Sequence, residues 1–186
     1  MRIITGRAKG LRLKTPKNFS TRPTADRVKE SLFSILSGLI NFPEINSVLD
    51  IFAGTGALGL EAMSRGANSA IFIDNATAEI IRENISRTKF ESCNVLRGDF
   101  EKILSKLAKQ SLTFDLIFSD PPYAKGLAQK SLELVAEKNL LVEGGLMIIE
   151  HGAEEILDVP TNFNLIRKIT YGHTTAITIL ERKTSA

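Results

Sequence analysis

Four consecutive residues, Asp120-Pro121-Pro122-Tyr123, have the side chains and backbone needed to hold a planar amino group. Two prolines fix the backbone and donate no hydrogen bonds, so their carbonyl groups are free to accept. One N–H of the amino group would go to the Asp120 carboxylate and the other to the Pro121 carbonyl, while Tyr123 stacks on the ring. The two acceptors would orient the nitrogen lone pair and stabilise developing positive charge. The alternative is a rigid turn without chemistry, since Asp-Pro pairs are common in turns.

A glycine-rich segment, Asp50-Ile51-Phe52-Ala53-Gly54-Thr55-Gly56, lies where the first strand of a predicted sheet ends and a helix begins. Glycines there permit a tight turn and close approach of a ligand, and the helix N-terminus presents free N–H groups. With Gly59 the segment matches G-x-G-x-x-G, and Asp74 at the end of the next predicted strand could bind both hydroxyls of an adenosine ribose. The pattern fits NAD and S-adenosylmethionine alike, and a structural turn without a ligand is the alternative.

Asp50 favours S-adenosylmethionine over a dinucleotide. A carboxylate before the glycines would repel a pyrophosphate but would attract the ammonium end of a methionine moiety. Asp99 could accept from an adenine amino group while Phe100 packs on the ring, and an N-cap role for Asp99 is compatible with this. The candidate cofactor residues are Asp50, Phe52, Ala53, Gly54, Thr55, Gly56, Asp74, Asn75, Asp99 and Phe100.

Short apolar runs alternate with helical stretches after residue 46, and this order predicts a doubly wound α/β fold with a mostly parallel, seven-stranded sheet. Only Tyr171-Gly172-His173-Thr174 joins the last two runs, so they should form an antiparallel hairpin at the sheet edge. The predicted strands are Ser47–Phe52, Ser69–Asp74, Asn94–Arg97, Phe114–Ser119, Leu146–Glu150, Asn164–Thr170 and Thr175–Leu180. The predicted helices are 24–39, Leu58–Arg65, Ala76–Phe90, Phe100–Ala108 and Leu127–Lys138.

The first part of the chain is strongly basic. Residues 1–29 contain nine Lys or Arg against one acid, Asp26, although the whole chain has 24 basic and 21 acidic residues. A basic end on an otherwise acidic chain suggests a polyanionic partner, because phosphate contacts supply sequence-independent affinity; a solvated arm is the alternative. Runs at Arg2–Thr5 and Leu11–Thr15 predict a β-hairpin. We therefore divide the chain into a basic hairpin extension, 1–22, and a cofactor-binding domain, 23–186.

Composition argues against several classes of protein. With 43% hydrophobic and 24% charged residues, the chain is that of an ordinary globular domain. One cysteine and two histidines make an internal disulfide impossible and a metal site improbable. Cys93 is best explained as a small core residue, and His151 and His173 stay unassigned. The sequence has no apolar run of membrane-spanning length and no secretory signal, so we expect a cytoplasmic protein, which we take to be a monomer.

Several of these motifs together resemble a known family. The segment Asp50–Ala62 with Asp120–Tyr123 resembles the class I, Rossmann-like amino-methyltransferases. The opening Arg2–Gly6 and the segment Arg22–Phe33 resemble, more narrowly, the bacterial methyltransferases that modify the N2 amino group of one guanine in 16S ribosomal RNA. The resemblance covers nearly the whole chain and implies the same fold, S-adenosylmethionine as cofactor, and ribosomal RNA or a small-subunit particle as partner.

The resemblance also implies that the N-terminal hairpin and the loop at Arg22–Thr24 bind RNA, which agrees with the charge distribution. The target base would be splayed out of its stack to reach Asp120. Arg27 and Lys29 could instead pair with Asp26 or Glu30. The candidate phosphate contacts are Arg7, Lys9, Arg12, Arg22 and Arg27.

Two other functions use the same motifs. A DNA adenine or cytosine amino-methyltransferase would share the Asp-Pro-Pro-Tyr tetrapeptide, but the chain has no room for a separate target-recognition domain. A non-catalytic cofactor-binding or RNA-binding module would not need an intact tetrapeptide. The sequence does not identify the modified guanine, or tell free RNA from an assembled particle as substrate.

Overall fold

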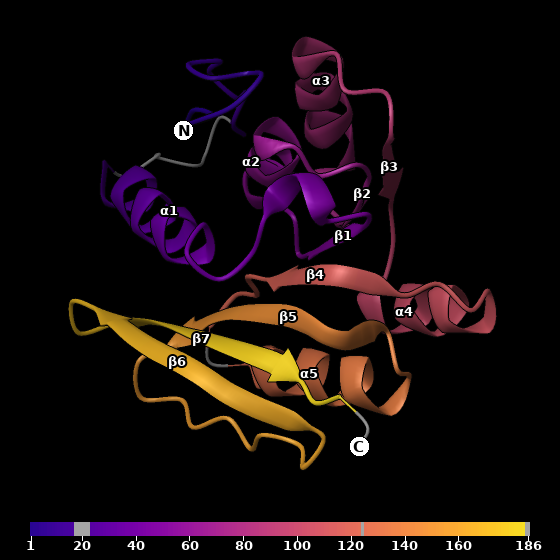
Figure 1. Ribbon diagram of the computed structural model, residues 1–186. Helices are drawn as coiled ribbons and strands as arrows, with labels where there is room; N and C mark the ends of the chain where they lie inside the picture. Colours follow the sequence, from indigo (N-terminus) through magenta and orange to yellow (C-terminus); the bar gives the residue numbers. More distant parts are fainter. Residues whose placement is uncertain (17–22, 124, 185–186) are drawn as a thin grey trace.

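The computed structural model of the protein describes residues 1–16, 23–123 and 125–184, and its centre is one seven-stranded sheet (Figure 1). The strands are β1 Val48–Ile51, β2 Ala70–Ile73, β3 Cys93–Leu96, β4 Phe114–Ser119, β5 Leu141–Gly152, β6 Phe163–Tyr171 and β7 Thr175–Arg182. The helices are α1 Pro23–Leu36, the short 3-10 helix Phe42–Glu44, α2 Ala57–Arg65, α3 Ala78–Thr88, α4 Phe100–Lys109 and α5 Leu127–Glu137.

The strand order is β3-β2-β1-β4-β5-β7-β6. Strands β1 to β5 are parallel, whereas β7 pairs antiparallel with both β5 and β6. The predicted doubly wound fold with an antiparallel C-terminal hairpin is therefore confirmed. The chain reverses its direction of travel across the sheet between β1 and β4, and ligands of such sheets bind in the crevice at the carboxyl ends of these strands.

Strand β5 is longer than predicted. The apolar run suggested only Leu146–Glu150, but the strand begins at Leu141 and ends at Gly152. Its first part contains Gly144 at φ +73°, and the pairing register with β4 shifts between Phe114 and Leu116. This irregularity explains the difference, since a glycine-containing bulge interrupts the alternation by which a strand is recognised.

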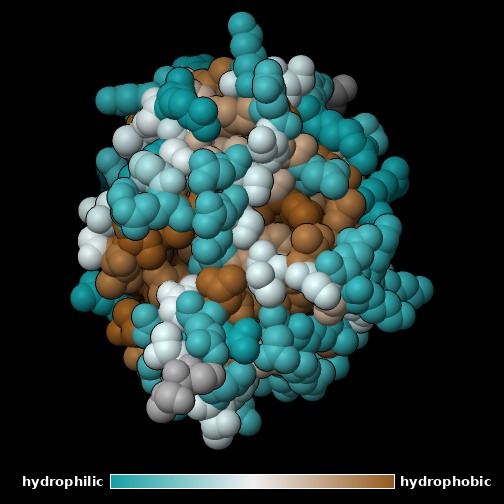
Figure 2. Space-filling model, turned by 45° about the vertical axis from the view of Figure 1, so that its right-hand side comes forward, coloured by the Kyte–Doolittle hydropathy of each residue, from teal (hydrophilic) through white to brown (hydrophobic). Residues whose placement is uncertain are grey.

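Helices cover both faces of the sheet. Alternate residues of each strand point to opposite faces, so Val48 of β1 packs with α1, α2 and α3, whereas Leu49 packs with α4 and α5. We call these the α1–α3 face and the α4–α5 face. Hydrophilic side chains cover most of the surface seen in Figure 2, and hydrophobic residues lie in the hollows between them.

The N-terminal segment departs from the predicted hairpin. Arg2 and Arg12 form an isolated antiparallel bridge, flanked by a hydrogen bond from the Ile3 N–H to the Leu11 carbonyl. Two full strands do not form, because the next N–H groups, of Ile4 and Thr5, donate to the Glu61 carboxylate of α2. The segment is nevertheless well packed: Ile3 and Leu13 are buried in the same core as α1 and α2.

No helix in the described parts of the chain has the length and apolar composition needed to cross a membrane.

Candidate active site

Three carboxyl groups lie on the same face of the sheet at its carboxyl edge. The alternation along β1, β4 and β5 places Asp50, Asp120 and Glu150 on the α1–α3 face, in line with Val48, Phe118 and Ile148 below them. All three line one cavity of about 630 Å³. A volume of this size suits a small-molecule ligand.

The cavity brings together residues from distant parts of the chain. It contains five predicted cofactor residues, Asp50, Phe52, Ala53, Gly54 and Thr55, and two predicted catalytic residues, Asp120 and Tyr123. The other described lining residues are Met1, Thr15, Pro16, Val28, Lys29, Leu32, Ala57, Leu58, Thr77, Glu150, Tyr171, Thr174, Thr175 and Ile177. The N-terminal segment thus forms one wall of the same cavity as the glycine loop.

The loop after β1 has the unusual backbone that its glycines suggest. Gly54 and Gly56 have φ values of +57° and +78°, a conformation that costs glycine little. Phe52 also has a positive φ, +60°, and such strain in a non-glycine residue is typical of ligand sites. The Gly54 N–H donates to Asp74 Oδ2 at 2.9 Å, which joins the end of β2 to the loop.

Asp50 lies below this loop and is almost completely buried. Its Oδ2 accepts a hydrogen bond of 2.9 Å from the N–H of Gly59, at the beginning of α2. Burial raises the pKa of Asp50 to about 7; the Gly59 hydrogen bond opposes this shift and the charge of Asp74 adds to it. Asp50 is therefore partly protonated at neutral pH until a cation approaches it.

Gly59 of α2 packs tightly against side chains of the sheet, and we expect Gly59→Ala to lower the free energy of unfolding by about 1–3 kcal/mol. An added Cβ would lie 2.5 Å from Phe72 Cε1 and 3.1 Å from Asp50 Oδ2, so ring and carboxylate must both move. Urea denaturation measures the change. Gly38→Ala is the control, because its Cβ meets only the Ile35 carbonyl, at 3.4 Å. Equal stability of the two variants would contradict this close packing.

The tetrapeptide begins directly after β4. The Asp120 N–H donates to the Ile51 carbonyl at 3.4 Å, which holds the tetrapeptide beside the end of β1. Asp120 is a solvent-exposed residue that lines the cavity. Partial desolvation by the protein raises the pKa of its carboxyl group, and the charges of Glu150 and Asp50 raise this pKa further.

Tyr123 is fixed by its hydroxyl group. The hydroxyl donates to Glu150 Oε1 at 2.6 Å and lies 3.0 Å from Thr175 Oγ1. Burial, and the hydrogen bond to Glu150, raise the pKa of Tyr123, so the phenol stays protonated at neutral pH. The ring therefore has a set position at the cavity wall.

Some predicted cofactor residues lie outside the lining of the cavity. Phe100 is buried and packs on Phe52, with ring centroids 4.7 Å apart, so it supports the ring that lines the cavity. Asp99 is the N-cap of α4, where its Oδ1 accepts from the Lys102 N–H at 3.1 Å. Asn75 is exposed. Gly56, Asp74 and the prolines Pro121 and Pro122 also do not line it.

Thr77 is a lining residue that the sequence did not suggest. Its Oγ1 is buried and has no hydrogen-bond partner within the described part of the chain. A buried hydroxyl without a partner is unfavourable, so a ligand in the cavity would stabilise it. The only sequence signal was its place as N-cap of α3, where threonine is common for structural reasons.

Lys29 has a different partner from those considered in the sequence. It is buried, donates to the Arg2 carbonyl at 2.6 Å, and lies 3.4 Å from Glu61 Oε2. Burial lowers the pKa of Lys29, while the charge and hydrogen bond of Glu61 oppose this shift. The close ion pair of Lys29 is therefore with Glu61 of α2, and Asp26, one of the two partners considered from the sequence, acts on Lys29 through its charge.

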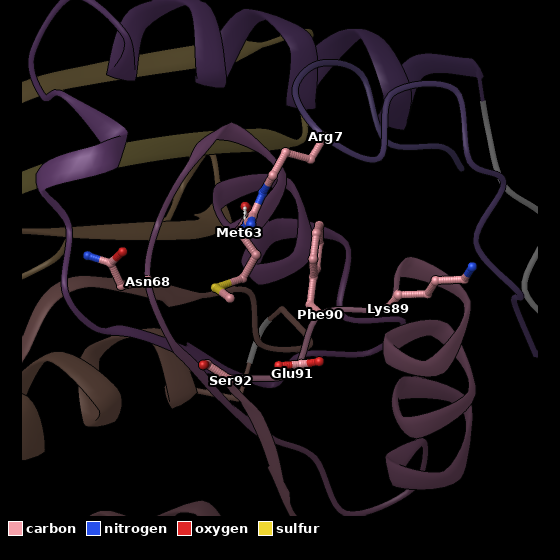
Figure 3. A pocket seen from close by; sticks show the side chains of 7 residues that line it. All are labelled: Arg7, Met63, Asn68, Lys89, Phe90, Glu91 and Ser92. Carbon is pink, nitrogen blue, oxygen red and sulfur yellow. Dashed lines mark hydrogen bonds between the residues drawn. The ribbon is translucent and has the colours of Figure 1, made fainter.

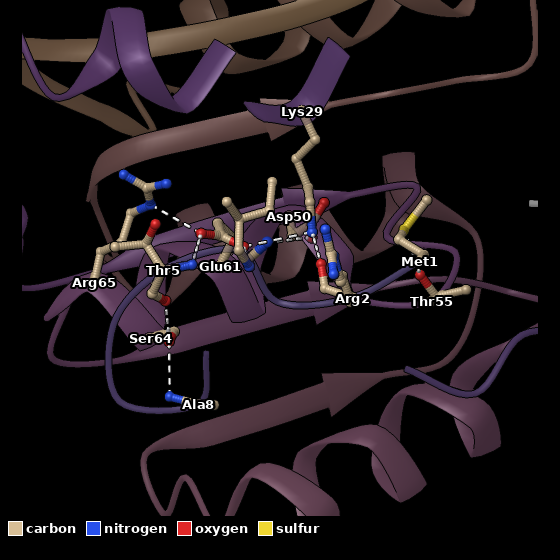
Figure 4. A network of polar contacts seen from close by, with 12 residues as sticks. Met1, Arg2, Thr5, Ala8, Lys29, Asp50, Thr55, Glu61, Ser64 and Arg65 are labelled. Carbon is tan, nitrogen blue, oxygen red and sulfur yellow. Dashed lines mark hydrogen bonds and ion pairs between the residues drawn. The ribbon is translucent and has the colours of Figure 1, made fainter. Parts of the chain in front are cut away.

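Glu61 is the centre of the polar network in Figure 4. Its two carboxylate oxygens accept from the backbone N–H groups of Ile4 and Thr5 and from Arg65 Nε, at 2.7, 3.0 and 2.9 Å. Close by, Ser64 Oγ donates to the Thr5 carbonyl and accepts from the Ala8 N–H. The network attaches the N-terminal segment to α2.

Asn84 makes a second attachment. This buried residue of α3 donates to the carbonyls of Lys14 and Thr55 at 3.0 and 2.9 Å and accepts from the Lys14 N–H at 2.7 Å. One side chain therefore joins the N-terminal segment to the loop after β1. Positions 14 and 84 are too far apart in sequence for either contact to be visible there.

The described RNA-binding candidates Arg7, Lys9, Arg12 and Arg27 are all exposed; Arg22 lies outside the described residues. Arg7 has partners within the protein. Its guanidinium donates to the Met63 carbonyl at 3.0 Å and lies 5.1 Å from the centre of the Phe90 ring. Figure 3 shows this side chain extending between the two residues, in a separate cavity of about 210 Å³.

The two histidines differ in setting. His151 is buried on β5 and makes hydrogen bonds with the Gly152 carbonyl and Thr178 Oγ1, at 2.9 and 2.8 Å, whereas His173 is exposed in the last turn. His151 therefore has a structural role. Burial raises the pKa of Cys93 to about 12, as expected for an unreactive thiol. The described residues contain no cluster of His, Cys, Asp or Glu suited to a metal ion.

Comparison with known proteins supports the resemblance. A family model described as conserved hypothetical protein 95 matches residues 1–180. Ribosomal RNA small subunit methyltransferase D of Escherichia coli (strain K12) is 35% identical over 175 residues, covering 92% of this chain and 85% of the relative. The chain belongs to the family that this model describes, to which the small-subunit ribosomal RNA methyltransferases D are similar over most of the chain. The enzyme of the same name from Haemophilus influenzae is also 35% identical, over 176 residues, with coverage of 92% and 89%.

The family likeness extends to the three-dimensional structure. A solved structure of a hypothetical protein from Thermus thermophilus superimposes with a TM-score of 0.82 and 32% sequence identity. The match covers 97% of this chain and 99% of the other. The likeness in structure therefore extends over nearly the whole chain.

Proposed function

We propose that this protein transfers a methyl group from S-adenosylmethionine to the exocyclic N2 amino group of a guanine in 16S ribosomal RNA. The observation that carries the proposal is the shared cavity. Asp120 and Tyr123 of the tetrapeptide line the same space as Asp50, Phe52 and Gly54 of the loop after β1. A cavity that holds the methyl donor and the amino group that receives the methyl lowers the entropic cost of bringing the two together.

The residues present fit this cofactor. Asp50 would face the methionine ammonium, Phe52 and Ala53 supply apolar surface, and the buried Thr77 hydroxyl lacks a partner among the described residues. Asp74 already accepts from backbone N–H groups, but each carboxylate oxygen can accept more than one hydrogen bond, so ribose binding stays compatible. When bound, the cofactor supplies an electrophilic methyl group.

The residues of the chain orient the amine and stabilise its charge. Asp120 and the Pro121 carbonyl each accept one N–H, which turns the nitrogen lone pair toward the methyl group. The nitrogen becomes positive as the new bond forms, and the nearby carboxylate stabilises that charge. The methylated nitrogen loses its proton after the methyl group has been transferred, so Asp120 does not need to be a strong base.

The substrate follows from the relatives and from charge. Relatives that align over about nine-tenths of this chain are named as methyltransferases of small-subunit ribosomal RNA. The exposed Lys9, Arg12 and Arg27 provide cations for phosphate contacts near the cavity wall that the N-terminal segment forms. We further propose that 1–22 acts as the RNA-binding extension, and that the protein works as a cytoplasmic monomer.

Mass-spectrometric mapping of methylated guanines tests the proposal. The protein is incubated with labelled S-adenosylmethionine and either naked 16S RNA, small-subunit particles or DNA. We expect label at N2 of one guanine in an RNA-containing sample, and S-adenosylmethionine, but not NAD, should raise the melting temperature. Label in DNA alone would overturn the substrate, and stabilisation by NAD alone would overturn the cofactor.

Cofactor binding should release protons near neutral pH. A cation beside Asp50 favours its ionised form, so binding lowers a pKa that lies near 7 in the free protein. The affinity should therefore rise as pH increases through about 6 to 7. The folded protein holds the Asp50 proton up to about pH 7, whereas the unfolded chain loses it near pH 4, so without cofactor this group lowers stability as the pH rises from about 4 to about 7.

Calorimetric titration in two buffers of different ionisation enthalpy measures the released protons. Asp50→Asn should weaken binding by about 1.5–3 kcal/mol, the value of a hydrogen bond to a charged group, and should reduce proton release. Proton release equal to that of the unchanged protein would contradict the role of Asp50.

A further inference from the structure

Glu150 has no role in the chemistry derived so far, although it lies beside the tetrapeptide. The register pairs Ser119 of β4 with Ile149 of β5, so the next residues, Asp120 and Glu150, are lateral neighbours. Adjacent strands are about 4.8 Å apart, and both side chains lie on the α1–α3 face and line the cavity. Glu150 is therefore placed to accept a hydrogen bond from a ligand directly beside Asp120.

Within the described part of the chain, the Glu150 carboxylate is held in place through one of its oxygens. Its Oε1 accepts from the Tyr123 hydroxyl at 2.6 Å, and within the described residues no hydrogen bond reaches its Oε2. Tyr123 is in turn close to Thr175 Oγ1 on β7, and Glu150 itself pairs with Ile177 of that strand. One oxygen is thus used for positioning, whereas the described residues leave the other free for a ligand.

We propose that Glu150 reads the ring N1–H of the target guanine and so selects guanine over other bases that carry an amino group. The proposal deepens the proposed function and rests on it. Guanine has an N–H at N1 directly beside its amino group, whereas the ring nitrogens beside the amino groups of adenine and cytosine are acceptors. Two neighbouring acceptors, Asp120 for the amino group and Glu150 for N1–H, match guanine alone.

Adenine and cytosine are rejected by repulsion as well as by the loss of the hydrogen bond to Glu150. A ring nitrogen that presents a lone pair to Glu150 would leave two acceptors facing each other, with no proton between them. Sites that pair a buried polar group with one substrate discriminate strongly against an analogue that leaves this group unpaired. The Tyr123 hydroxyl and Thr175 then have a positioning role, because they act on the base through the Glu150 carboxylate.

The experiment compares two bases at the target position of synthetic RNA. One carries guanine and the other 2-aminopurine, which keeps the 2-amino group but has a lone pair in place of N1–H. The position is that found by the mapping experiment, and the synthetic segment is ligated into full 16S RNA where the protein requires it. We measure kcat/KM for both bases with the unchanged protein and with Glu150→Gln, whose amide N–H can donate to N1.

The unchanged protein should prefer guanine by about 10- to 100-fold, the value of one unpaired buried acceptor. In Glu150→Gln this preference should fall at least about 10-fold, because guanine loses a charged acceptor and 2-aminopurine gains a donor. The exposed Glu154 provides the matched control, and Glu154→Gln should keep the preference. An unchanged preference in Glu150→Gln would overturn the proposal.

A second variant separates loss of the fold from loss of recognition. Glu150→Asp keeps the charge and should keep the preference for guanine, even if its rate falls, whereas a preference lost equally in both variants would overturn the proposal. If the unchanged protein methylates no guanine at N2, the proposed function itself fails. If it methylates guanine and Glu150→Gln does not alter the preference, only the role of Glu150 fails.

Discussion

Replacing Asp120 by alanine is expected to lower kcat by about 10²–10³-fold, the usual loss when one preorganised polar contact to the transition state is removed. The reason is the position of Asp120, which follows β4, lines the same cavity as Asp50 and would accept a hydrogen bond from the target amino group. The affinity for S-adenosylmethionine should change little, because the loop after β1 and Asp74 stay intact. Single-turnover methyl transfer measures the rate, and equilibrium titration measures the affinity.

The control for this variant is Asp158→Ala. Asp158 is an exposed carboxylate in the loop before β6, and its neighbours Leu157 and Val159 pack on the α4–α5 face, away from the cavity. Its removal should leave the rate unchanged. Normal turnover in the Asp120 variant would refute the catalytic assignment, and an equal loss in both variants would point to a general defect.

Glu61→Gln should have the largest effect on stability, lowering the free energy of unfolding by about 3–5 kcal/mol. The Glu61 side chain is fully buried, and it neutralises Lys29, which is 3% exposed. Without this charge, the buried Lys29 loses its close ion-pair partner. The new amide N–H₂ group also faces donors such as the Ile4 and Thr5 N–H groups. Urea denaturation followed by circular dichroism measures the change.

Glu79→Gln is the matched control, because Glu79 also pairs with an arginine on its own helix. Its side chain is 76% exposed, and exposed pairs contribute about 0–1 kcal/mol. If both variants lost the same stability, the network in Figure 4 would not be what attaches the N-terminal segment. The double variant Lys29→Met with Glu61→Leu should recover part of the loss, since it removes both buried charges.

Local patterns were enough to predict the parallel sheet and part of the site. Buried parallel strands are short apolar runs, and the helices between them are long enough to carry an amphipathic pattern. Residues at the carboxyl ends of these runs must meet at one edge of the sheet. For this reason Asp50 and Asp120 could be placed together from sequence, although 70 positions separate them.

Residues whose role depends on a distant partner could not be predicted. The extension was expected to pair as a hairpin, but Glu61 takes the backbone donors of Ile4 and Thr5. A buried carboxylate that contacts a segment 56 residues away has no local signal. Lys29 is similar: as a lysine near a helix start it suggests an exposed charge, and only the packing of α1 against α2 buries it.

The sequence by itself determined the fold class, the loop after β1, the position of the candidate catalytic tetrapeptide and the family. These features depend on periodicity, turn residues and contiguous motifs, which act over a few neighbouring positions. Only the tertiary structure decided that the N-terminal segment forms a wall of the cavity, that Phe100 supports Phe52, and that Glu150 lies beside Asp120. Each of these depends on strand register and helix packing, which join residues that are far apart along the chain.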